Sequence, residues 1–106
     1  MIDERVRDQV VKLLLDGELV EAEVEAEDAS ILITDRRVLV IHGRAITMNC
    51  PISRLRRIQL DVERGVPATM AIVPEDLTVV PQILRLADSS LVTAAAAVGL
   101  VGARLG

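Results

Sequence analysis

The sequence predicts an α+β fold that is mainly β, with a helix at each end of a series of short strands. Three observations lead to this prediction. Residues 3–15 carry an apolar stripe at helical spacing, residues 18–80 contain short apolar runs separated by turn signals, and residues 81–105 are apolar at a seven-residue spacing. The chain has 106 residues, which is enough for a single domain with one hydrophobic core.

The first segment is predicted to be an amphipathic helix over residues 3–15. Its apolar positions fall on one helical face and are Val6, Val10, Leu13 and Leu14. Asp3 is expected to cap the helix at its N-terminus, and Gly17 stands where a C-terminal capping glycine is common.

The strands are expected within residues 18–80. Residues 18–27 alternate small or branched apolar side chains with glutamates, which is typical of a strand with one dry and one solvated face. Two core strands, 31–33 and 37–41, are expected to flank the polar corner Thr34-Asp35. Four more strands are predicted at about 45–49, 56–63, 68–73 and 77–80, with one helical turn after Pro51.

The C-terminal segment 81–105 is predicted to be helical, with Pro81 in its first turn and a break that Asp88-Ser89-Ser90 could introduce. A heptad-like seam gives the candidate interface Leu84, Ala87, Leu91, Ala94, Val98 and Val101. Three uses of this apolar segment stay open: packing over the barrel and the N-terminal helix, self-association, or shallow membrane contact. The longest uncharged run, 89–103, is shorter than the roughly 20 residues of a membrane-spanning helix.

Three short motifs occur in an order that resembles bacterial pleckstrin-homology-like (PH-like) domains. They are Gly17-Glu18, Thr34-Asp35-Arg36-Arg37 and Pro51-Ile52-Ser53-Arg54-Leu55. The resemblance covers roughly residues 13–90 and implies a partly open antiparallel barrel of about seven strands, with one end plugged by a C-terminal helix. Two departures matter: the plugging helix has no Trp, and loop 27–30 is acidic where phosphoinositide-binding members carry Lys and Arg. No phosphoinositide site is therefore expected.

Composition excludes several kinds of function. The chain has no Phe, Tyr or Trp, so it cannot form aromatic stacking platforms for single strands or cages for quaternary amines. Its net charge of −4 argues against nucleic acid as a partner. The single cysteine, Cys50, fits a reducing compartment, and no signal pattern begins the chain, so a cytoplasmic location is expected. The excess of Arg over Lys suggests a GC-rich bacterial or phage source.

Charge is segregated along the chain. Residues 16–28 hold seven acids and no base, whereas residues 36–57 hold six arginines. Arg54, Arg56 and Arg57 form a candidate anion patch, although pairing of the acidic strand with basic strands across the sheet is favoured. Similarly, Asp35 is expected to cap its turn while an arginine lies over the barrel end.

Enzymatic chemistry is not expected. A nucleophilic Cys50 would need His42 as a base beside it, and a lone histidine makes a metal site improbable. No cofactor is expected. The sequence predicts a non-enzymatic protein–protein interaction or assembly module that self-associates, with an anion-, lipid- or nucleic-acid-binding adaptor using residues 36–57 as the alternative.

Overall fold

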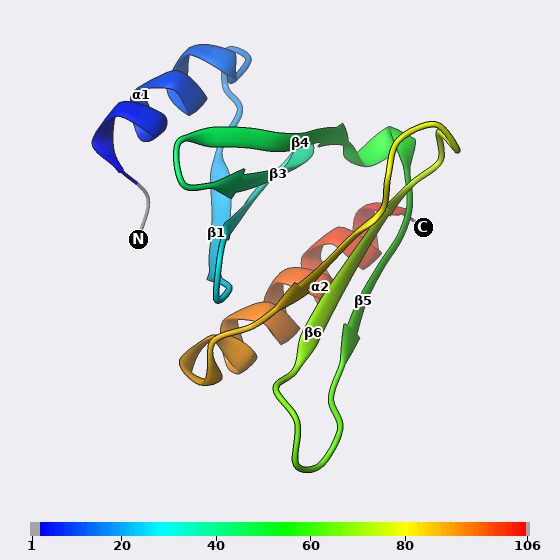
Figure 1. Ribbon diagram of the computed structural model, residues 1–106. Coiled ribbons are helices and arrows are strands. Elements are labelled where there is room, and N and C mark those ends of the chain that lie inside the picture. The colour runs from blue at the N-terminus through cyan, green and yellow to red at the C-terminus, as the bar shows by residue number, and fades with distance from the viewer. Residues whose placement is uncertain (1–2, 106) are drawn as a thin grey trace.

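Residues 3–105 of the computed structural model form two antiparallel sheets and two helices (Figure 1). One sheet has the order β1-β2-β3-β4 and the other β5-β6-β7. The elements are α1 (Glu4–Leu13), β1 (Val20–Glu25), β2 (Ser30–Thr34), β3 (Arg37–His42), β4 (Ala45–Pro51), β5 (Leu55–Asp61), β6 (Thr69–Pro74), β7 (Gln82–Arg85) and α2 (Leu91–Leu105), with 3-10 turns at Ile52–Arg54 and Asp88–Ser90. The predicted α+β, mainly β class is confirmed.

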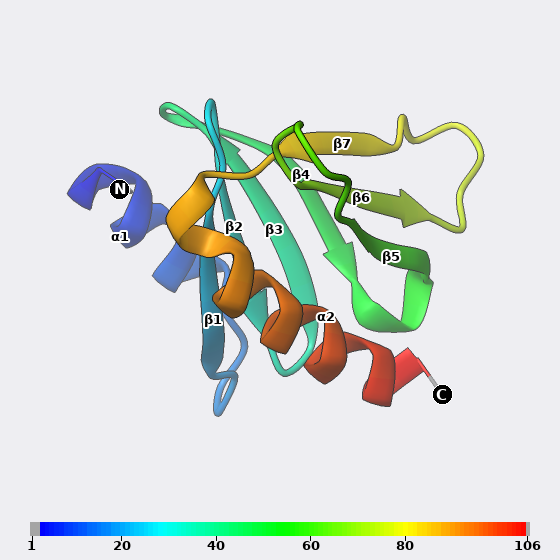
Figure 2. The same cartoon turned by 90° about the horizontal axis from the view of Figure 1, so that it is seen from below.

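The two sheets form a partly open barrel. At one corner the ends of β1 and β7 meet, where the Glu27 N–H donates to the Arg85 carbonyl at 2.8 Å and Ala26 forms a bridge with Leu86. On another side no strand formed by residues 3–105 closes the gap, and α2 lies against both β1 and β5 (Figure 2). The partly open barrel that the resemblance implied is therefore present, with α2 covering an opening.

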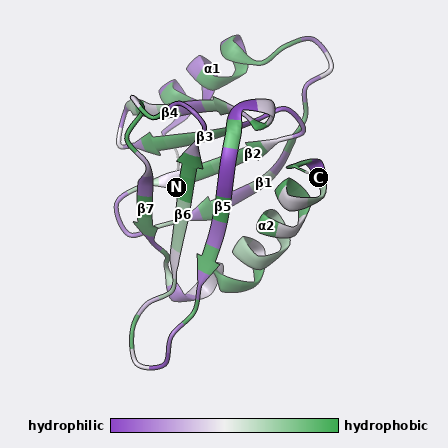
Figure 3. Ribbon diagram, turned by 90° about the vertical axis from the view of Figure 1, so that its right-hand side faces the viewer, coloured by the Kyte–Doolittle hydropathy of each residue, from purple (hydrophilic) through white to green (hydrophobic). Residues whose placement is uncertain are grey.

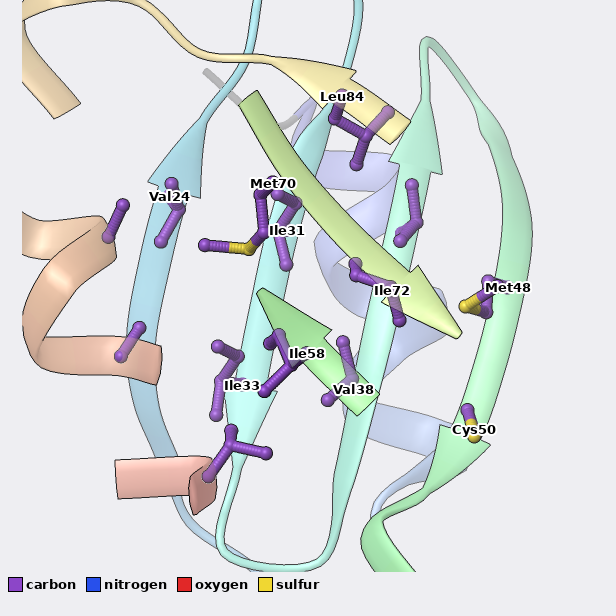
Figure 4. Packing of buried hydrophobic residues seen from close by; sticks show 14 of the residues in the cluster. Val24, Ile31, Ile33, Val38, Met48, Cys50, Ile58, Met70, Ile72 and Leu84 are labelled. Carbon is purple, nitrogen blue, oxygen red and sulfur yellow. The ribbon is translucent and has the colours of Figure 1, made fainter. Parts of the chain in front are cut away.

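The barrel interior is built from aliphatic side chains with Met48, Cys50 and Met70, and it contains no aromatic ring. Branched side chains of β2 and β3 face Ile58, Met70 and Ile72 of the second sheet (Figure 4). The α2 side chains Ala94, Ala97 and Val101 complete this core and are fully buried. Because small residues face the barrel from the helix, α2 can lie close to the strands without a large plugging side chain.

Helix α1 packs on the outer face of the four-stranded sheet. Val6 and Val10 are buried there against Leu32, Leu39 and Ile41. Strands β2 and β3 are thus covered on both faces, which explains why their sequence is continuously apolar. The expectation that the C-terminal segment also covers α1 is wrong, because α1 and α2 contact different faces of this sheet (Figure 1).

The N-terminal cap was predicted correctly, but the C-terminal cap was not. Asp3 accepts a hydrogen bond from the Arg5 N–H at 2.8 Å, as an N-cap does. The helix ends at Leu13, and its C-cap is Leu14 in an extended conformation. Gly17 has a φ of +77° but lies in the turn that follows, so it does not cap the helix.

The predictions for residues 77–87 are wrong, whereas the predicted break at Asp88-Ser89-Ser90 is present as a 3-10 turn. Residues 77–80 form a loop, and the last strand is β7, which lies where a helix starting at Pro81 was expected. Leu84 faces the core from β7, paired with Met70 of β6, and α2 begins only at Leu91. Sequence spacing alone could not distinguish a helix from a strand at residues 82–85. Pairing with β6, and not the local pattern, decides which apolar run becomes a strand.

Candidate functional site

The first two motifs of the family resemblance meet at one end of the barrel around a buried carboxylate. The Glu18 side chain is 0% exposed and accepts hydrogen bonds from the Thr34 hydroxyl at 2.6 Å and the Leu15 N–H at 2.9 Å. Arg37 donates to both of its oxygens, from Nε at 2.9 Å and from Nη2 at 3.0 Å. This bidentate pair joins the segment before β1 to the start of β3.

The Glu18 carboxylate is held in its charged form. Burial alone would raise its pKa, but the hydrogen bonds from Thr34 and Leu15 and the hydrogen bond and charge of Arg37 outweigh burial and lower it. All four hydrogen bonds that the Glu18 carboxylate accepts come from within the protein, so its role is structural and no acceptor position is left for a ligand. The expectation that an arginine lies over the barrel end in a structural role is therefore correct for Arg37.

The β2–β3 corner is capped differently from the prediction. The Thr34 hydroxyl accepts the N–H groups of Arg36 at 3.0 Å and Arg37 at 2.9 Å. Asp35 instead accepts the Leu19 N–H at 3.0 Å, outside the turn. Thr34 caps the corner because its hydroxyl reaches the N–H groups two and three residues ahead.

The acidic segment is paired, but with other arginines than expected. Glu21 binds Arg104 of α2 through two contacts of 2.6 and 2.7 Å, and Glu23 lies 3.4 Å from Arg7 of α1. Glu27 lies 3.6 Å from Arg85 of β7. Glu21 and Glu23 therefore attach both helices to β1, and the predicted pairing with the arginine-rich segment 36–57 is seen for Glu18 and Arg37.

The ion pairs of the acidic segment do not involve the candidate anion patch. Arg54, Arg56 and Arg57 are exposed near the start of β5. Arg54 borders the acidic residues Glu75 and Asp76, whose charges offset its own. Within residues 3–105, Arg56 and Arg57 form no ion pair. The structure thus keeps two of the three predicted cations available.

His42 and Cys50 do not form a catalytic pair. They lie toward opposite ends of the β3–β4 hairpin, His42 opposite Ala45 and Cys50 opposite Val38, and they line different hollows. Burial, with a smaller contribution from the charge of Glu75, raises the pKa of the Cys50 thiol. A protonated, buried thiol is a poor nucleophile. Among the described residues, no group of three His, Cys, Asp or Glu side chains is placed to hold a metal ion.

The predicted interface seam is not one continuous surface. Leu84 lies on β7, and Ala87 precedes the short turn before α2. Ala94 and Val101 are 0% exposed because they pack into the barrel core. Ala94 and Val101 form the inner side of α2, whereas Leu91 is 36% exposed, so the structure supports packing of the seam over the barrel but not over α1.

The six seam residues did not include the opposite side of the same helix, which is exposed. Its exposed residues include Val92, Ala95, Ala96, Gly99 and Ala103. Figure 3 shows that α2 carries no strongly hydrophilic residue until its C-terminal end. The signal was present in the sequence, because residues 89–103 lack any charge on either helical face.

Length and composition alone would also allow this segment to cross a membrane. The segment Asp88–Leu105 meets that criterion, and 22% of it is buried. Its buried residues are those that cover the barrel, so a spanning arrangement would expose the aliphatic core.

Solved structures share this architecture. A pleckstrin homology domain from Shewanella amazonensis SB2B matches with a TM-score of 0.66 and 11% sequence identity, covering 95% of this chain and 96% of that one. A DUF1696 family protein with a pleckstrin-homology domain from Shewanella loihica PV-4 matches with a TM-score of 0.71 and 10% identity, covering 97% and 92%. No family model and no curated protein match the sequence. The comparisons therefore establish a bacterial PH-like fold.

Proposed function

We propose that this PH-like fold is a non-enzymatic interaction module that self-associates through the outward face of α2. One observation carries the proposal: the outward residues Val92, Ala95, Ala96, Gly99 and Ala103 are exposed and uncharged, although the inward face already completes the core. A helix that only covered a barrel would gain solubility from polar residues on its outer side.

The residue sizes on this face favour a second helix as the partner. Ala96, Gly99 and Ala103 leave the helix backbone accessible, and small side chains let two helices approach closely. Val92 is 83% exposed and would supply the largest apolar contact at one end. Two copies related by a two-fold axis can place this face against itself, which is the usual geometry of a homodimer.

Size-exclusion chromatography with light scattering tests the proposal over a wide range of protein concentrations. We expect the wild-type chain to exceed its monomer mass of 11.5 kDa as concentration rises, and Ala96→Glu to remain monomeric. Val62→Glu is the matched control, since Val62 is 65% exposed in the loop between β5 and β6. A wild-type monomer at every concentration, or an unchanged mass for Ala96→Glu, would refute self-association through α2.

Anion binding is the second candidate, favoured by Arg56 and Arg57 on β5, which form no ion pair with any residue of the described part of the chain. It predicts salt-sensitive binding to vesicles that contain anionic lipid or to nucleic acid, lost in a variant with Glu at positions 54, 56 and 57. Arg64→Glu, in the exposed loop after β5, changes the net charge as much as the single variant Arg56→Glu does and is its matched control. Absence of binding at low ionic strength would eliminate this candidate.

A further inference from the structure

Strand β4 has a free edge. One side of the strand pairs with β3, from Arg37 opposite Pro51 to His42 opposite Ala45. On the other side, within residues 3–105, no strand pairs with β4. Figure 4 shows β4, which carries Met48 and Cys50, at the margin of the sheet. A free edge presents main-chain donors and acceptors that another strand can use.

The groups that face outward can be identified. The Thr47 carbonyl accepts the Gln82 side-chain amide at 3.2 Å, so it points away from β3. Main-chain groups alternate in direction along a strand, so the Asn49 N–H and C=O and the Pro51 carbonyl point the same way. Asn49 is exposed, and a partner strand could reach these groups from solvent.

The edge lacks the charged residues that many natural edge strands use against pairing, since β4 has none from Ala45 to Pro51. Pro51 stands at one end of the strand, and a bulge lies toward the hairpin end. The register shift at Val40/Ile41 makes Thr47 the extra residue of this bulge, so the stretch from Met48 to Pro51 remains regular.

A hollow of about 260 Å³ runs beside this regular stretch. Its walls are β4 residues 47–51 and, opposite them, Pro74, Asp76 and Val79, with Arg54 at the same site. The two charged residues have opposite signs, so the hollow favours neither an acidic nor a basic occupant. Pro74 and Val79 would contact the side chains on one face of an added strand.

From these features we infer that β4 binds an extended, uncharged polypeptide segment of a partner protein as an added strand. Main-chain hydrogen bonds to Asn49 and Pro51 would hold the segment, and alternate small apolar side chains would enter the hollow. This site is separate from the outward face of α2 and does not depend on self-association.

Amide hydrogen exchange and NMR on the full chain test the inference. The probe is an alternating threonine–valine heptapeptide blocked at both ends, compared with the same peptide N-methylated at every residue. We expect the Asn49 amide to exchange faster than the amides of Met48 and Cys50 in the free protein. The unmethylated peptide should slow it by at least about tenfold, because one new main-chain hydrogen bond protects it.

Two variants separate the main-chain bond from the side chain. Asn49→Ala keeps the N–H and should bind the peptide as wild type does, whereas Asn49→Pro removes it and should weaken binding about tenfold. Proline is tolerated at edge positions, and Pro51 already occupies an equivalent outward position.

Three results would overturn the inference. The first is an Asn49 amide that does not respond to millimolar peptide, and the second is equal binding by the two variants. The third is protection of Asn49 that rises with protein concentration without peptide, because a second copy would then occupy the edge.

Discussion

Replacing Glu18 by Ala should strongly destabilise the protein. The change removes the acceptor of four hydrogen bonds and leaves the Arg37 guanidinium without its carboxylate. Breaking a buried ion pair costs about 3–5 kcal/mol. The Arg37 side chain keeps 14% exposure and the Thr34 hydroxyl can turn to the Arg37 carbonyl, so the lower end, about 3 kcal/mol, is expected. Small domains are stable by only about 5–15 kcal/mol, so the loss is large.

Urea unfolding followed by far-UV circular dichroism measures this loss, since the chain has no aromatic fluorophore. With an m-value of about 2 kcal/mol/M, the midpoint should fall by about 1.5 M. Glu23→Ala is the matched control, because the Glu23 pair with Arg7 is exposed and worth at most about 1 kcal/mol. If Glu18→Ala and Glu23→Ala shift the midpoint equally, the buried network does not carry the stability assigned to it.

The same network sets a pH dependence. The folded state lowers the pKa of Glu18, so its contribution is present above the unfolded pKa of about 4.3 and is lost as pH falls through the folded value. The stability difference between wild type and Glu18→Gln should therefore be constant near neutral pH and shrink below about pH 4. A difference that persists unchanged into acid would show that the Glu18 charge is not involved.

Three further tests, using two pairs of substitutions and one labelling reaction, address separate parts of the fold. Ala94→Leu should destabilise by about 1–3 kcal/mol because Ala94 is fully buried, whereas Ala95→Leu on the exposed side should have little effect in urea unfolding of the monomer. Gly43→Ala should cost about 1 kcal/mol because Gly43 has a φ of +57°, but Gly99→Ala should stabilise helix α2 by a similar amount; equal signs in thermal melts would contradict this. Cys50 should react slowly with a thiol reagent in the native protein and quickly in urea, and rapid native labelling would disprove its burial.

Much of the fold could be predicted because the local patterns agreed with the tertiary arrangement. The strict alternation of residues 18–27 marked β1, and the apolar runs on either side of Thr34 marked β2 and β3. The order of the short motifs then indicated a PH-like barrel, which the two Shewanella structures confirm as a fold. These signals are local, so the chain sequence alone contains them.

The errors arose where long-range contacts decide the outcome. Leu84 fits the seven-residue spacing of the later helix, yet pairing with β6 places it in a strand. Glu18 looked like one more acid in an acidic stretch, but its burial depends on Arg37, nineteen residues away. The free edge of β4 could not be seen in sequence, because an edge is defined by the absence of a neighbour.

The position of α2 has a consequence for the time course of folding. The helix closes the gap between β1 and β5. The α2 residues that contact β1 are synthesised some eighty residues after it, and the Glu21–Arg104 pair spans 83 residues. Chain closure over such a distance is slow, and exposed apolar surface invites aggregation in the meantime. We expect the inward faces of the two sheets to stay partly accessible during synthesis until Val101 has emerged, because Ala94, Ala97 and Val101 complete the barrel core.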